Sequence, residues 1–117
     1  MFESLTRFLP TLEHVQELED AIYAFQEDHP DFELNHYYDI LERNGLKWDM
    51  SSMTEADPAV LDGQAVMALL IGAVRAEHFC GGAFFDFCES GSMERWLARL
   101  KEIDETASLE KKRSSLL

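Results

Sequence analysis

The clearest periodic pattern of the chain spans residues 12–27, where apolar residues recur at spacings of three and four. Such positions form one stripe along a helix of 3.6 residues per turn. The residues between them are mostly acidic, so the opposite face of the predicted helix carries negative charge. His29-Pro30 should end this helix, because the residue before a proline is disfavoured in helical geometry. The apolar stripe consists of Leu12, Val15, Leu18, Ile22 and Phe25.

The least polar stretch, residues 64–79, has apolar residues in nearly every direction around a helix. A helix that is hydrophobic all round is surrounded by others, so we expect this one at the centre of the fold. Asp62 can cap its start. Small residues such as Gly72 let neighbouring helices approach, at a cost of about 1 kcal/mol relative to alanine. Gly81-Gly82 should then break or bend the helix before a second, phenylalanine-rich piece.

The remaining segments of the chain show weaker hydrophobic patterns. Residues 46–56 alternate only loosely, which indicates a loop that Trp48 anchors to the core, with a single strand as the alternative. Residues 93–103 predict a last amphipathic helix, and residues 105–117 a polar tail. Short helical segments are expected over residues 3–9, after Asn35 and after Asp57-Pro58.

Together these elements predict an all-α fold. With 117 residues, 46% of them hydrophobic, the chain has the size and the apolar material of one ordinary domain. We expect a single compact domain over residues 1–104, with five or six helices around the central buried helix at about 64–79. The helices at 12–27 and 93–103 should pack against it. Runs without strand alternation disfavour a sheet.

The net charge of -13 limits the choice of partners. Residues 1–62 carry 15 acidic and 3 basic side chains, whereas residues 63–117 carry 8 and 7, so the acidity belongs to the first half. Because nucleic-acid binding depends on Lys and Arg displacing counterions from phosphates, binding to DNA or RNA is not expected. An acidic surface favours a basic protein partner or mimicry of nucleic acid.

The chain shows no sign of export or of a membrane span. Its first residues lack the basic and apolar regions of a signal peptide. The uncharged run 63–74 is shorter than the roughly 20 residues that a span requires. We therefore expect a cytoplasmic protein whose two cysteines, Cys80 and Cys88, are free thiols.

In the runs 39–41, 44–46, 65–80 and 96–104, the chain resembles a family of small bacterial proteins known only as a domain of unknown function. The resemblance runs from Phe8 to Asp104 and is most specific at residues 75–82, where the family typically reads Arg-x-Glu-Arg-Phe-Cys-Asp-Gly. His78 and Gly81 replace the arginine and the aspartate of that pattern. The resemblance implies a fold type and a bacterial cytoplasmic setting, but no activity and no catalytic residues.

The candidate site lies at the helix break and comprises Arg75, Glu77, His78 and Cys80. Arg75 and His78 are i, i+3 neighbours on one helix face, with Glu77 to the side. Buried charges are rare unless paired, so we expect Arg75 to be partly buried and to bridge to a carboxylate of an adjacent helix. A ligand-binding role for the same residues is the alternative.

Metal binding and catalysis find weaker support in this segment. His78, Cys80 and Cys88 match no recognised zinc spacing, and no metal or other cofactor is assigned. Cys80 could be a nucleophile activated by His78 only if Gly81-Gly82 unwinds the turn, since residues i and i+2 of a helix point apart. No catalytic residue is therefore assigned.

The sequence favours a non-enzymatic protein-interaction module that associates with itself through the phenylalanine-rich segment. A homodimer or a basic protein is the expected partner. The alternatives are a small-molecule-binding or metal-binding protein or an enzyme with its site at residues 75–82, and an acidic mimic of nucleic acid.

Overall fold

The computed structural model describes residues 1–9 and 14–116, with side chains as far as Leu109. This part of the chain forms seven α-helices, three short 3-10 helices and no strand, which confirms the all-α prediction. It is one compact globule. The elements are α1 Glu3–Thr6, α2 Val15–Asp28, η1 Pro30–Phe32, η2 Leu34–His36, α3 Tyr37–Arg43, α4 Met50–Glu55, η3 Pro58–Val60, α5 Gly63–Phe79, α6 Ala83–Glu89 and α7 Ser92–Leu116.

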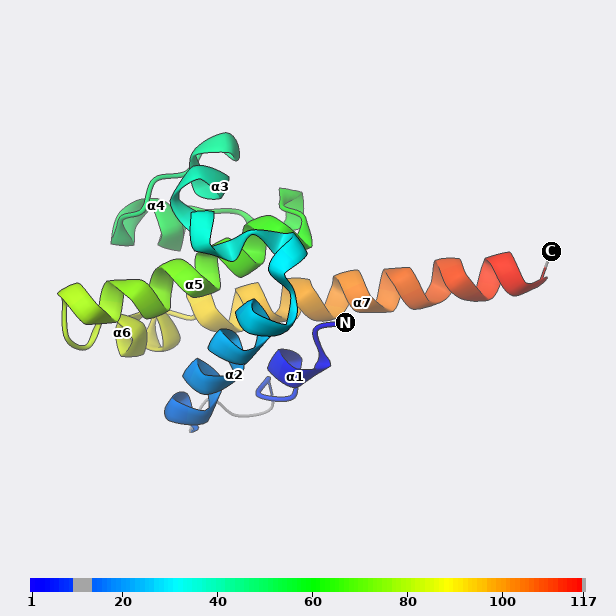
Figure 1. Cartoon of the computed structure of the whole chain (residues 1–117), viewed down its shortest axis with the longest axis horizontal. Helices are drawn as coiled ribbons and strands as arrows, with labels where there is room; N and C mark the ends of the chain where they lie inside the picture. Colours follow the sequence, from blue (N-terminus) through cyan, green and yellow to red (C-terminus); the bar gives the residue numbers. More distant parts are fainter. Residues whose placement is uncertain (10–13, 117) are drawn as a thin grey trace.

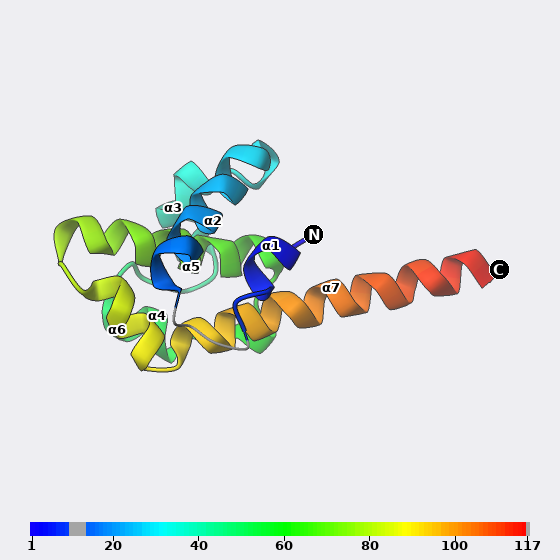
Figure 2. The same cartoon turned by 90° about the horizontal axis from the view of Figure 1, so that it is seen from below.

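Helix α5 is the centre of the fold, as its apolar sequence predicts. Asp62 caps it by accepting a hydrogen bond from the backbone N–H of Ala65 at 2.8 Å. Every residue from Ala65 to Val74 is buried. Helices α2, α3, α6 and α7 all contact α5, and Figures 1 and 2 show them arranged around it. The complete burial follows because a helix with apolar residues on all sides must be covered on all sides.

Helix α2 presents its apolar stripe to the core and its acidic face to solvent. Leu18, Ile22 and Phe25 are buried, and Val15 is half-buried. Leu12, the first residue of the predicted stripe, lies outside the described residues. The contact of α2 with α5 confirms the predicted packing.

The segment after Trp48 forms a helix, so the prediction of a loop over residues 46–56 is wrong for its second half. Helix α4 begins because the Asp49 carboxylate accepts a hydrogen bond from the backbone N–H of Ser52 at 2.7 Å. One turn later Met53 is buried in the core. Helix α4 is too short to show a repeating apolar pattern. Its start is marked instead by an ordinary N-cap, an aspartate whose carboxylate accepts from the backbone N–H three residues later.

Helix α7 packs on the core with its first half. Met93, Trp96, Leu97 and Leu100 are fully buried. Side chains from Glu105 to Leu109 are exposed. The backbone of residues 105–116, predicted as a polar tail, continues α7, and Figures 1 and 2 show it extending past the other helices. Among the helices described, none is long and apolar enough to cross a membrane.

Candidate functional site

The break between α5 and α6 is held by the carboxylate of Glu77. Gly82, with a φ of 91°, lets the chain turn between the two helices. One oxygen of Glu77 accepts a hydrogen bond from the N–H of Gly82 at 3.1 Å, and the other from the N–H of Phe84 at 3.4 Å. Because the first N–H groups of a helix have no partner within it, Glu77 caps α6 and has a structural role.

Within the residues that the structure describes, Arg75 does not make the ion pair that its sequence context predicts. Among the described residues, no carboxylate lies within 4.0 Å of its guanidinium group. Its side chain is partly buried. Its Nε atom is buried and has no hydrogen-bond partner among the described residues. Within the part of the chain that the structure describes, Arg75 therefore does not join α5 to another helix through an ion pair. The guanidinium instead lines a pocket of about 510 Å³ between α5, α2 and the residues that follow α2.

His78 faces α2 rather than Cys80. Its Nε2 lies 3.3 Å from the hydroxyl of Tyr23, which also lines the pocket beside Arg75. Burial raises the pKa of nearby Glu19, and repulsion from Glu77 and Asp20 raises it further, while His78 opposes the shift. His78 is thus part of a polar contact between α5 and α2.

Cys80 lies on a second pocket, of about 210 Å³, on the side of α5 that faces α4. Its walls are almost entirely apolar. The indole of Trp48 stands at one side, with its ring centroid 5.7 Å from that of Phe79 in an edge-to-face arrangement. We call this the Phe79 pocket, and it is lined by Trp48, Asp49, Met50, Met53, Ala76, Phe79, Cys80, Ala83 and Phe87.

The phenylalanine-rich segment is divided between the core and the surface. Phe84 and Phe87 are buried, each with 1% of its surface exposed. Phe79 is 79% exposed and Phe85 is 51% exposed. Only Phe79 and Phe87 line the Phe79 pocket, so the exposed ring of Phe85 lies outside it. The segment therefore supplies both packing and apolar surface.

The two thiols differ in their surroundings. Cys80 is exposed, whereas Cys88 is half-buried beside the core. Burial, with a smaller contribution from the charge of Glu19, raises the pKa of Cys88 to about 11. Cys88 is therefore protonated at neutral pH and is a poor nucleophile.

The structure thus separates the four predicted site residues. Arg75 and His78 face α2, Glu77 caps α6, and Cys80 opens onto the Phe79 pocket. Within the described residues, no three His, Cys, Asp or Glu side chains are placed to hold a metal ion together. Sequence reasoning missed Met50 and Met53 in the pocket wall, because it treated their segment as a loop.

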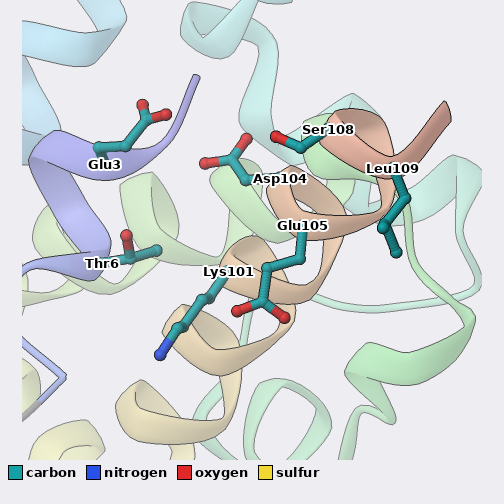
Figure 3. Close-up of a pocket in the computed structure, with 7 residues that line it drawn as sticks. All are labelled: Glu3, Thr6, Lys101, Asp104, Glu105, Ser108 and Leu109. Atoms are coloured by element: carbon teal, nitrogen blue, oxygen red, sulfur yellow. The ribbon is translucent and has the colours of Figure 1, made fainter. Parts of the chain in front are cut away.

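A further pocket, of about 460 Å³, lies where α7 passes α1. Figure 3 shows Glu3 and Thr6 of α1 on one side and Asp104 of α7 opposite them. Asp104 accepts hydrogen bonds from the backbone N–H of Phe2 at 2.8 Å and from the amino group of Met1 at 3.1 Å. Burial disfavours the charged amino group, but Glu3 and Asp104 outweigh this effect and raise its pKa. These groups tie α1 to α7.

Comparison with family models, with curated proteins and with solved structures found no match to this chain. The resemblance to a family of small bacterial proteins stays a prediction.

Proposed function

We propose that this protein is a non-enzymatic interaction module that binds a basic segment of a partner protein through the Phe79 pocket. One apolar side chain of the partner fills the pocket. Cationic residues on either side of it are attracted by Asp49 and by the net negative charge of the protein. The observation that carries the proposal is the exposed ring of Phe79 at the mouth of an apolar pocket.

The first support is the large apolar surface left uncovered at this position. Phe79 is 79% exposed and Met50 is 42% exposed, and both line the same pocket. Burying a phenylalanine side chain stabilises by about 2 kcal/mol, and the fold gains little of this from Phe79. A partner side chain that covers the ring would gain it on binding. Exposed apolar patches with polar rims are typical of interaction sites.

The second support is the rigidity of the pocket walls. The indole N–H of Trp48 donates a hydrogen bond to the carbonyl of Gly72 at 2.9 Å, which fixes the ring against α5. Met53, Ala83 and Phe87 are buried in the core behind it. A pocket whose walls are already fixed loses less conformational entropy when it binds a ligand.

Charge decides between the expected partners. The protein carries a net charge of -13, and Asp49 stands on the pocket rim. The C-terminal end of α5, at Phe79, adds the negative end of the helix dipole. Two copies of the chain would bring like charges together, whereas a basic segment is attracted. The chemistry therefore favours a cationic partner over the predicted homodimer.

A peptide array tests the proposal. Each peptide carries one central residue, either Leu, Phe or Ala, flanked by Lys, by Ser or by Glu. We expect lysine-flanked Leu and Phe peptides to bind, and lysine-flanked Ala and all glutamate-flanked peptides to fail. The Phe79→Ser variant should lose this binding, and Phe85→Ser should keep it as a matched control, because both rings are exposed but only Phe79 lines the pocket.

Two other results would point to other occupants. One result is binding that needs lysine but no central apolar residue and that survives Phe79→Ser. This result would indicate that the protein acts as an acidic mimic of nucleic acid. A dimer seen by light scattering at micromolar concentration and abolished by Phe79→Ser would indicate a second copy. Either outcome would overturn the proposed basic, apolar segment.

A further inference from the structure

The pocket around Arg75 contains a cationic group whose pairing is incomplete. Within the described residues the guanidinium has no carboxylate within 4.0 Å, and its buried Nε has no hydrogen-bond partner. A buried donor without a partner is costly, and a charged one more so. Trp96 also has an unpaired buried N–H, but Trp96 is enclosed in the core. Arg75 is different because its side chain also lines a pocket of about 510 Å³.

The other walls of this Arg75 pocket supply hydrogen-bonding groups. Tyr23 and Gln26 come from α2, and Asn35 comes from η2. The Tyr23 hydroxyl is held 3.3 Å from Nε2 of His78, which restrains its position. Leu34 adds an apolar contact. A small number of polar groups converging on a partly apolar pocket of this volume is typical of small-molecule sites.

The charges at the pocket limit the ligand. Arg75 presents a planar guanidinium, which binds a carboxylate through two parallel hydrogen bonds. Glu27 lines the same pocket with a negative charge, and no ion pair joins the two residues. The surrounding first half of the chain is strongly acidic, which disfavours a ligand with two negative charges such as phosphate. One carboxylate together with one cationic group fits both walls.

From this geometry we infer that the Arg75 pocket binds a small zwitterion of the amino-acid type. The ligand carboxylate lies on the guanidinium group of Arg75, and the ammonium group lies on the side of Glu27. Tyr23, Gln26 and Asn35 complete the hydrogen bonds. The Phe79 pocket shares no lining residue with this site, so the two proposals stand or fall separately.

The test measures the melting temperature of the full chain with each of the L-α-amino acids at millimolar concentration. Each amino acid is compared with its N-acetyl derivative, which lacks the ammonium group, and with its amide, which lacks the carboxylate. A ligand that binds only the folded state raises the melting temperature as its concentration increases. We expect at least one amino acid to do so and both of its derivatives to fail.

Variants locate the binding. Arg75→Gln should raise the apparent Kd at least about tenfold, the factor expected for loss of a charged hydrogen-bond donor. Glu27→Gln should raise it several-fold, and Glu42→Gln on α3, which removes the same charge outside the pocket, should leave it unchanged. If Arg75→Gln does not fold, Gln26→Ala and Glu27→Gln make the same test.

Three results would overturn the inference. The first is that no amino acid raises the melting temperature of the wild-type protein. The second is that a derivative with only one of the two charges binds as well as its parent. The third is that the Arg75 pocket variants bind the amino acid as tightly as Glu42→Gln does.

Discussion

The indole N–H of Trp48 donates a hydrogen bond to the carbonyl oxygen of Gly72 at 2.9 Å, across 24 positions of sequence. A side chain at position 72 would crowd this contact. A Cβ there would lie 3.1 Å from the terminal methyl of Met53 and 3.3 Å from the Trp48 ring. The glycine in the middle of α5 therefore lets one wall of the Phe79 pocket sit directly on the helix.

Substitutions of Trp48 measure this anchor. Trp48→Phe removes the hydrogen bond and keeps a ring, so we expect a loss of about 1 kcal/mol in the free energy of unfolding. Trp48→Ala also removes the packing and should cost about 3 kcal/mol. Urea denaturation followed by circular dichroism gives both values. Equal losses for the two variants would show that the hydrogen bond, rather than the ring contacts, holds the segment.

The cap at the helix break predicts a second effect. Glu77→Ala leaves the N–H groups of Gly82 and Phe84 without their acceptor and should lower the free energy of unfolding by about 1 kcal/mol. Glu77→Gln keeps one acceptor oxygen and should cost less. Glu89→Ala, at an exposed position of α6, is the matched control and should change little. A loss for Glu89→Ala as large as that for Glu77→Ala would contradict the capping role.

The raised pKa of Glu19 predicts how stability depends on pH. The folded protein holds the proton of Glu19 more tightly than the unfolded chain does, so stability falls as pH rises from about 4.5 through the raised pKa. At pH 7 the charged carboxylate is destabilising, and Glu19→Gln should raise the melting temperature. This gain should shrink as the pH is lowered and Glu19 itself is protonated.

Glu42→Gln controls for the change in net charge in the same experiment, because Glu42 is exposed on α3. Its melting temperature should follow that of the wild type across the pH range. A stabilisation by Glu42→Gln equal to that by Glu19→Gln would assign the effect to net charge instead of the local environment.

The thiols should react at different rates. A thiol reagent such as 5,5′-dithiobis(2-nitrobenzoate) should modify Cys80 rapidly at pH 8, because Cys80 is exposed. Cys88, half-buried and with a pKa of about 11, should react slowly until the protein unfolds. Cys80→Ser should abolish the fast phase. A fast phase that persists in Cys80→Ser and disappears in Cys88→Ser would contradict this assignment.

The sequence predicted the elements whose burial is periodic or complete. The apolar stripe of α2, the all-round apolar surface of α5 and the cap at Asp62 each identified an element correctly. The sequence did not predict α4, because its six residues are too few for a periodic apolar pattern and its start depends on the Asp49 cap.

The candidate site was harder to predict than the fold. Arg75, Glu77, His78 and Cys80 are neighbours in sequence, but their side chains point to different parts of the fold: Arg75 and His78 toward α2, Glu77 toward the start of α6 and Cys80 toward the Phe79 pocket. Arg75 faces Tyr23 across 52 positions of sequence, and Cys80 faces Trp48 across 32. Such contacts are fixed by how the helices pack, which local patterns do not determine.

Methyl NMR with labelled methionine tests the proposed docking surface most directly. Met50 and Met53 line the Phe79 pocket, whereas Met67 and Met93 are buried elsewhere in the core. On titration with a lysine-flanked leucine peptide, we predict that the methyl signals of Met50 and Met53 shift and saturate while those of Met67 and Met93 stay in place. The same titration of Phe79→Ser should produce no shift. Binding that leaves Met50 and Met53 unmoved would contradict the proposal that the Phe79 pocket is the docking site.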